Sequence, residues 1–410
     1  VHRQDAVLQV TGRAKYVSDM VRPGMLYAKV LWSGVPHATI LDLDVEPARE
    51  MDGVAAVITA DDIPNNTLGF THKDQPVLAG ERVRYPGDPL AVVAAESQEI
   101  AEEALKRIEV DYEVLPTVMS IEEAMAPDVP TLHGDSNLAA HIKIRDGDIE
   151  QGWADSDHII EESLSTQMVE HCPLEPHAAL AEVDDLGKIL LYSSVGRPFL
   201  IASEVAGILD LPMNRVRLVV PSVGGNFGGK NETSLEPWVC LLALKTRRPV
   251  KLVYTREEEF QTSTVRHPYE ISYRTGVKAD GTLVARQVEI WSDTGAYVTW
   301  GESTLSKACI HAVGPYRVPH VKIDGYLVYT NKSPGGAMRG FGVTQLGFAY
   351  ECHTDTIATE LGIDPLEFRM KNLLEDGARL PTGQVLEKVS AKETVRQAVK
   401  LAGWKEVEPA

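Results

Sequence analysis

The sequence predicts an α+β fold, and three observations support this prediction. Strand-like and helix-like runs are mixed along the 410 residues without a repeating βαβ array. Several strand runs are joined by short turn signals, the clearest being Asp280-Gly281 within 273–291. A turn-rich stretch, 121–140, separates 1–120 from 141–410. We therefore expect a small mixed domain, a linker and a larger second domain.

The elements of the N-terminal part follow from its hydrophobic pattern. Residues 25–33 and 90–97 are apolar runs of strand length. The segment 99–116 begins as a helix and ends as a strand. In its helical half, apolar side chains recur at a spacing that places them on one helix face, namely Ala101, Ala104, Leu105 and Ile108.

The second part contains further strands and three helices. Two β runs flank the turn at 184–187, and 215–220 is a short strand. Helices are predicted over 235–245, 346–362 and 394–404. Glycines end the last two helices, because a left-handed C-cap favours a residue without a Cβ.

Charge and hydropathy exclude some function classes. The 40 Lys+Arg and 59 Asp+Glu give a net charge of −19, which disfavours a broad nucleic-acid surface. We find no apolar run of the roughly 18 residues that a membrane span needs, and no signal-peptide core at the N-terminus. We expect a cytoplasmic protein with no nucleic-acid partner and no membrane span.

The four cysteines show no local metal or disulfide signature. Cys172, Cys240, Cys309 and Cys352 are far apart and form no CxxC pair. We expect four buried structural thiols, because free cysteines are among the most buried residues.

The most informative segment is a glycine loop between a strand and a helix. Residues 222–232 hold Gly224, Gly225, Gly228 and Gly229, which permit positive φ and a close backbone approach to an anionic or oxo ligand. The segment matches most of a P-loop, but Asn231 stands where Ser or Thr would bind magnesium. A tight turn without a ligand is the alternative.

A second glycine segment strengthens the functional interpretation. Residues 333–342 place Arg339 and Phe341 within flexible backbone. An arginine offers a permanent charge to an oxyanion, and a phenylalanine can stack on a flat ligand. A buried structural arginine and a core phenylalanine are the alternative.

Together the two loops resemble the molybdenum-binding chain of the xanthine dehydrogenase/aldehyde oxidase family. GGNFGGK is similar to the family's GGGFGGK, and GAMRGFG to its GAFRGFG. The N-terminal part resembles the family's a/b hammerhead domain in 11–19, 33–44 and 80–97. The blocks 173–184 and 266–276 match as well, so the resemblance covers nearly the whole chain. It implies a hammerhead domain followed by the first molybdopterin-binding domain.

The resemblance implies hydroxylation of an electron-poor carbon with water as the oxygen source. The cofactor would be molybdenum on molybdopterin, in its cytosine dinucleotide form, with a sulfido or selenido ligand that accepts hydride. A metal ion lowers the pKa of bound water and so supplies a nucleophile near neutral pH. Electrons would pass to 2Fe-2S and FAD groups in partner subunits.

The family motifs also assign roles to residues of this sequence. Arg339 and Phe227 would lie beside the metal group without ligating it. The expected cofactor-binding residues are Gly225, Asn226, Phe227, Gly228 and Arg339. The expected substrate-binding residues are Phe341, Lys307 and Asn231.

Two of these positions depart from purine-oxidising relatives. Lys307 stands where they place an arginine, so it keeps the charge and loses the bidentate fork, and a solvated surface lysine is the alternative. Asn231 stands where they hold a substrate-binding glutamate. The departure at Asn231 argues against xanthine itself. Phe341 suits a flat ring and Lys307 suits an anionic or carbonyl-bearing one, so we expect another nitrogen heteroaromatic, nicotinate-like or purine-like. An aldehyde substrate is the alternative within the same chemistry.

The resemblance places the catalytic glutamate in a second molybdenum domain, and we find no such loop in the tail of this sequence. We therefore expect the general base, the iron–sulfur cluster and the flavin in partners, and no activity from this chain alone. The implied arrangement is a split molybdopterin chain with a second molybdopterin subunit, an iron–sulfur subunit, an FAD subunit and a small-molecule substrate. The chain is then either a separately encoded half or a fragment. A non-catalytic scaffold subunit is the alternative from another functional class.

Overall fold

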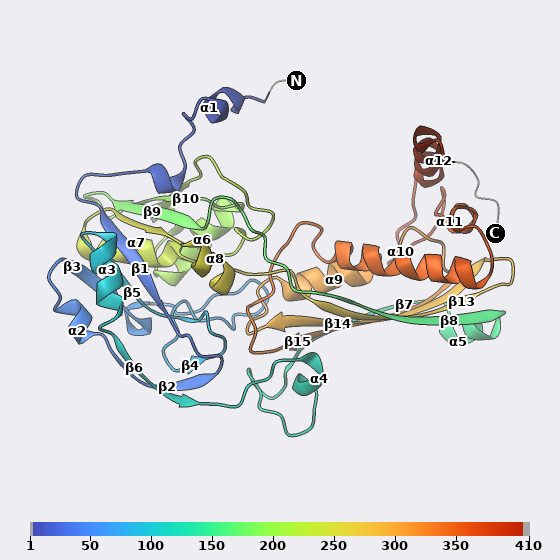
Figure 1. Cartoon of the computed structure of the whole chain (residues 1–410), viewed down its shortest axis with the longest axis horizontal. Coiled ribbons are helices and arrows are strands. Elements are labelled where there is room, and N and C mark those ends of the chain that lie inside the picture. Colours follow the sequence, from blue (N-terminus) through green and yellow to red (C-terminus); the bar gives the residue numbers. More distant parts are fainter. Residues whose placement is uncertain (1–2, 405–410) are drawn as a thin grey trace.

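The computed structural model describes residues 3–404 and shows an elongated molecule of two bodies joined near its middle (Figure 1). One body is built on a seven-stranded sheet and the other on a five-stranded sheet. Helices cover these mostly antiparallel sheets without βαβ alternation, which confirms the predicted α+β class.

The seven-stranded sheet combines strands from distant parts of the chain. Its order is β11 (Val216–Val219), β10 (Ile189–Ser193), β9 (Ala178–Val183), β12 (Val250–Val253), β1 (Leu26–Trp32), β5 (Pro89–Ala95) and β3 (Val54–Ile58). Helices α6 (Pro198–Ile208) and α7 (Glu236–Thr246) pack on one face, and α2 (Glu46–Arg49) and α3 (Gln98–Leu105) on the other. All seven residues of β5 are buried, because both faces of the sheet are covered.

A small three-stranded sheet adjoins this body. It consists of β4 (Arg82–Val83), β2 (Ala38–Asp44) and β6 (Glu109–Val114). The predicted change from helix to strand within 99–116 is confirmed as α3 followed by β6. Helix α3 begins where the Ser97 side chain accepts a hydrogen bond from the Ile100 N–H, and it buries Ala101 and Ala104 as predicted.

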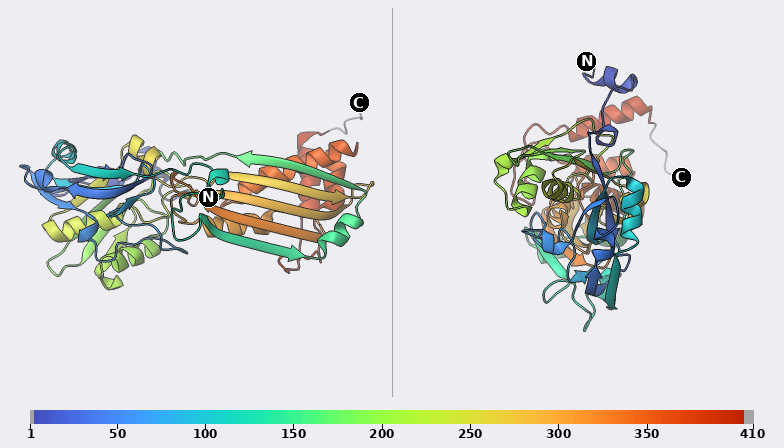
Figure 2. Two further views of the ribbon diagram at one scale, coloured as in Figure 1. Left: turned by 90° about the horizontal axis from the view of Figure 1, so that it is seen from below. Right: turned by 90° about the vertical axis from the view of Figure 1, so that its left-hand side faces the viewer.

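The second body is a long, mainly antiparallel sheet backed by helices. Its order is β7 (Leu138–Asp146), β15 (His320–Tyr329), β14 (Leu283–Gly295), β13 (Tyr269–Val277) and β8 (His158–Thr166) (Figure 2, left). Helices α9 (Gly301–His311) and α10 (Val343–Glu360) pack against one face (Figure 1). The remaining helices are α1 (Ala6–Val10), α4 (Ile121–Ala124), α5 (Ile149–Ala154), α8 (Arg256–Thr262), α11 (Pro365–Asn372) and α12 (Ala391–Ala402).

The two predicted domains are separate segments of the sequence, but they share a sheet in the structure. Strand β1 pairs in parallel with β12, Leu26 opposite Val250, so 1–120 and 141–410 share one sheet. The predicted linker 121–140 includes α4 and the start of β7, and it buries Ile121 and Leu132 in the core of the second body. This segment therefore packs as part of that body.

The expectation of four buried thiols is wrong for half of the cysteines. Cys240 and Cys309 are buried, whereas Cys172 is exposed and Cys352 is partly exposed. Cys172 lies in the loop between β8 and β9, where its side chain is exposed. Among residues 3–404, no helix is both long enough and apolar enough to cross a bilayer.

Candidate molybdenum-cofactor site

The two glycine segments meet where the two bodies join. We call 222–232 the first glycine loop, which runs from β11 toward α7, and 333–342 the second glycine loop, which runs from β15 to α10. The Arg339 N–H donates to the Phe227 carbonyl oxygen at 2.7 Å. A Cβ on Gly228 would lie 2.3 Å from the Ala337 carbonyl oxygen, so only glycine permits this approach.

Each loop holds a phenylalanine in the left-handed backbone region. Phe227 has φ 53° and Phe341 has φ 52°, and both have glycines beside them with φ near or above 90°. The left-handed conformation costs a non-glycine residue roughly 1–2 kcal/mol. Such strain gathers at sites where function requires it, and Phe227 is also 48% exposed.

The first glycine loop presents unused backbone donors. Asn226 Oδ1 accepts hydrogen bonds from the Gly228 N–H at 2.8 Å and the Lys230 N–H at 3.2 Å, which fixes the turn. The N–H groups of Gly225, Asn226 and Phe227 donate to no protein acceptor within the part of the chain that the structure describes. Consecutive free N–H groups are suited to an oxo or anionic ligand. The residues present therefore fit the group that the motifs imply.

Lys230 in the first loop is buried and is therefore not available to a ligand. Its side chain is 0% exposed, and its Nζ lies 3.1 Å from Glu175 Oε2. The same oxygen accepts the Gly224 N–H at 2.7 Å. Burial lowers the pKa of Lys230, against the opposing pull of Glu175. Glu175 therefore anchors the first glycine loop through both contacts.

Two side chains form hydrogen bonds with the backbone of Ala337 in the second loop. His171 Nε2 lies 2.8 Å from the Ala337 carbonyl oxygen, and Glu232 Oε1 accepts the Ala337 N–H at 3.1 Å. Burial lowers the pKa of His171, so the neutral ring donates from Nε2. Burial raises the pKa of Glu232 to about 7, and its Oε2 is buried without a hydrogen-bond partner among residues 3–404. Sequence reasoning missed Glu232, because it ends the first glycine loop and lies outside the GGNFGGK motif.

The second loop leaves Arg339 exposed. Its side chain forms no hydrogen bond or ion pair with any described residue, while its carbonyl oxygen accepts a bond from Arg266 Nη2 at 2.9 Å. Phe341 meets Trp300 edge-on, with 6.2 Å between the ring centres. Trp300 in turn stacks on Phe70 at 4.0 Å, and the Arg197 guanidinium lies 4.4 Å from its ring centre. Sequence reasoning missed these last three residues, because they come from three separate segments.

The two remaining predicted residues, Asn231 and Lys307, lie on different elements. Asn231 is in the first loop, and its side-chain oxygen lies beside Gly196. Lys307 is exposed on α9, on the same helix as Thr304 and Ala308, which pack under Gly342. Its ammonium forms no hydrogen bond or ion pair with any residue between 3 and 404.

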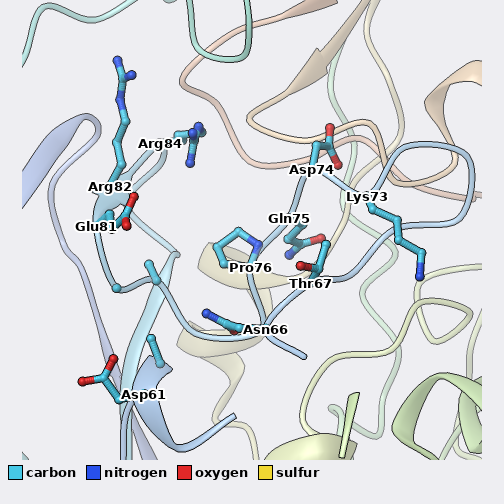
Figure 3. Close-up of a pocket in the computed structure, with 13 residues that line it drawn as sticks. Asp61, Asn66, Thr67, Lys73, Asp74, Gln75, Pro76, Glu81, Arg82 and Arg84 are labelled. Atoms are coloured by element: carbon cyan, nitrogen blue, oxygen red, sulfur yellow. The ribbon is translucent and has the colours of Figure 1, made fainter. Parts of the chain in front are cut away.

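A separate cavity of about 400 Å³ lies in the first body (Figure 3). Lys73, Arg82 and Arg84 line it together with Asp61, Asp74 and Glu81. None of the predicted site residues contributes to it. We therefore place the candidate site at the two glycine loops and not at this cavity.

Comparison with known proteins agrees with this geometry. Residues 11–116 match the aldehyde oxidase and xanthine dehydrogenase a/b hammerhead domain, and 132–373 match the molybdopterin cofactor-binding domain. The chain is 40% identical over 396 residues to the nicotinate dehydrogenase large molybdopterin subunit of Eubacterium barkeri, covering 96% of this chain and 93% of that protein. The chain belongs to the xanthine dehydrogenase/aldehyde oxidase family. The predicted family and its order of domains are therefore confirmed.

Other relatives in this family are longer than the region they share with this chain. The chain is 42% identical over 372 residues to a probable xanthine dehydrogenase subunit of Bacillus subtilis, covering 90% of this chain but 50% of that protein. Its fold matches the aldehyde oxidoreductase of Desulfovibrio gigas with a TM-score of 0.93 and 33% identity, over 98% of this chain and 46% of that one. Quinoline 2-oxidoreductase of Pseudomonas putida 86 matches with a TM-score of 0.92 and 30% identity, over 98% and 54%. The chain is a molybdopterin-binding component of an oxidoreductase family.

Proposed function

We propose that this chain forms one part of the molybdenum site of a multi-subunit hydroxylase that oxidises a nitrogen heteroaromatic. The observation that supports this proposal is the contact between the two glycine loops, Arg339 N–H to Phe227 C=O. That contact sets the Arg339 backbone against the loop whose N–H groups at 225–227 have no protein acceptor among residues 3–404.

The first loop and Arg339 would hold the cofactor, molybdopterin in its cytosine dinucleotide form. The N–H groups of 225–227 would donate hydrogen bonds to it, and the guanidinium would balance its negative charge. When bound, the cofactor supplies an activated oxygen from water and accepts two electrons with a hydride. The chain's own residues bind and orient the reactants, while Glu175, His171 and Glu232 hold the two loops in register.

The ring of Phe341 favours a flat aromatic substrate. Its ring is partly exposed and is fixed by the edge contact with Trp300. Asn231 can exchange hydrogen bonds with a ring nitrogen or carbonyl, and Lys307 can attract an anionic one. A nicotinate-like substrate agrees with the name of the relative that is 40% identical. An aldehyde is the second candidate, because aldehyde oxidoreductase shares the fold at 33% identity.

The proposal assigns proton abstraction to a glutamate of a second molybdopterin subunit. Two curated relatives extend to about twice the matched length, which leaves room for such a domain. An iron–sulfur subunit and an FAD subunit would carry the electrons away. A reducing compartment such as the cytoplasm suits four cysteines that are all free.

Removing the Arg339 guanidinium tests the proposal. We expect Arg339→Ala to abolish activity of the complex and to lower its molybdenum content, because the cofactor loses a charged hydrogen-bond donor. Metal analysis and pterin fluorescence of the purified complex measure this loss. Arg217→Ala, at an exposed arginine of β11, is the control. Unchanged metal and activity in Arg339→Ala would refute the assignment, and a wild-type complex without metal or pterin would favour a scaffold.

A further inference from the structure

Arg197 lies beside the candidate site and forms no ion pair among residues 3–404. It immediately precedes α6, and its side chain is exposed. Within residues 3–404 it forms no ion pair or hydrogen bond with a carboxylate. Glu204, two turns along the same helix, accepts a hydrogen bond from the Thr233 hydroxyl, and Arg197 acts on its carboxyl through space without forming an ion pair. An arginine without an acidic partner can accept one from a ligand.

The backbone ties Arg197 to the first glycine loop. The Gly196 N–H donates to the Lys230 carbonyl oxygen at 2.9 Å. A Cβ on Gly196 would lie 2.2 Å from Asn226 Nδ2 and 2.3 Å from Asn231 Oδ1. The residue before Arg197 therefore touches both a proposed cofactor-binding residue and a proposed substrate-binding residue.

Aromatic rings connect Arg197 to Phe341, the residue proposed to stack on the substrate. Its guanidinium lies 4.4 Å from the centre of the Trp300 ring, and Trp300 meets Phe341 edge-on at 6.2 Å. Trp300 is itself buried and is stacked on Phe70 at 4.0 Å, so the support is rigid. A guanidinium held on an aromatic face keeps the N–H donors at its edge available.

We propose that Arg197 binds the anionic substituent of the substrate, a carboxylate carried by the heteroaromatic ring. The planar fork matches a carboxylate with two parallel hydrogen bonds, which Lys307 cannot offer. Lys307 also has no contact that holds its ammonium in place within the described part of the chain. Arg197 is thus a specificity-determining residue, and this inference rests on the proposed function of the site.

Kinetics of the intact complex with two matched substrates test this role. Pyridine-3-carboxylate carries the charge, and pyridine-3-carboxamide has nearly the same shape without it. We expect Arg197→Ala to raise KM for the acid by about tenfold or more, with kcat and the KM for the amide changed by less than about threefold. Arg197→Lys should recover part of the effect. Arg217→Ala, at the exposed arginine of β11, should change nothing.

Calorimetric binding of benzoate, which carries the carboxylate without a ring nitrogen, separates binding from turnover. We expect Arg197→Ala to weaken benzoate binding about tenfold. Equal effects on acid and amide, or an acid-specific loss in Lys307→Ala but not in Arg197→Ala, would overturn the inference. If the wild type binds benzoate through Arg197 but oxidises neither pyridine, the anion site stands and the proposed substrate class fails. If Arg197→Ala binds benzoate as the wild type does, the inference fails whatever the complex oxidises.

Discussion

The two glycine loops place their cations in opposite surroundings. Lys230 of the first loop is fully buried against Glu175, whereas Arg339 of the second loop is exposed, without a partner among the described residues. Both residues follow glycine-rich sequence and look alike as ligand-binding cations. The structure shows that the first cation stabilises its loop and that the second is available to a ligand. A cation in a glycine motif is therefore not by itself a binding group.

The largest effect on stability is expected at Lys230. Lys230→Met leaves the Glu175 carboxylate buried without its cation, which typically costs about 3–5 kcal/mol. Arg339→Met should change the free energy of unfolding by less than about 0.5 kcal/mol, because an exposed side chain without partners is removed. Urea unfolding of the purified protein measures both values.

A double variant tests whether the unpaired Glu175 charge causes this loss of stability. Lys230→Met combined with Glu175→Gln removes both charges, so much of the lost stability should return. Equal destabilisation in the single and double variants would show that the lost stability does not come from the unpaired Glu175 carboxylate.

A smaller effect on stability is expected where the two loops touch. Gly228→Ala places a Cβ against the Ala337 carbonyl in a backbone with φ 114°. We therefore expect the free energy of unfolding to fall by at least about 1–2 kcal/mol and the molybdenum content of the complex to fall as well. Gly207→Ala is the matched control, because the space around that glycine of α6 is open. It should stabilise the helix by about 0.5–1 kcal/mol. Normal metal content in Gly228→Ala would contradict the proposed contact between the loops.

The smallest effect is expected at Glu232, which links the loops. Because its folded pKa is raised from 4.5 to about 7, the folded chain holds a proton in this window that the unfolded chain has released. The contribution of Glu232 to stability therefore falls as pH rises from about 4.5 to about 7. We expect the free energy of unfolding of Glu232→Gln, relative to that of the wild type, to rise by on the order of 1 kcal/mol from about pH 5 to about pH 8.

Urea unfolding at the two pH values measures this gain. Glu257→Gln, at an exposed glutamate of α8, is the control and should show no such trend. A constant difference between Glu232→Gln and the wild type would mean that Glu232 does not titrate in this window.

Several local predictions follow directly from short-range physics and are confirmed. The turn at Asp280-Gly281 joins β13 to β14, and α12 ends at Gly403 in the left-handed conformation. Helix α3 buries the predicted alanine face. Such features depend on residues within a few positions of one another, so the sequence carries enough information to predict them.

Features that depend on distant segments were not predicted. Nothing within 121–140 indicates that Leu132 reaches a core built from strands far along the chain. The expected burial of four cysteines rests on a residue-type average, whereas Cys172 lies exposed in the loop between β8 and β9. The stack of Phe70, Trp300 and Arg197 joins three segments that no local motif connects.

The sequence by itself determined the α+β class, the hairpins and helices, and, through its two glycine motifs, the family. Only the tertiary structure decided that Lys230 is buried, that Glu175, His171 and Glu232 hold the loops, and that Arg197 lies on Trp300. The physical reason is that backbone preference acts between neighbouring residues. Burial and charge pairing are set by contacts that exist only once the two bodies have folded against each other.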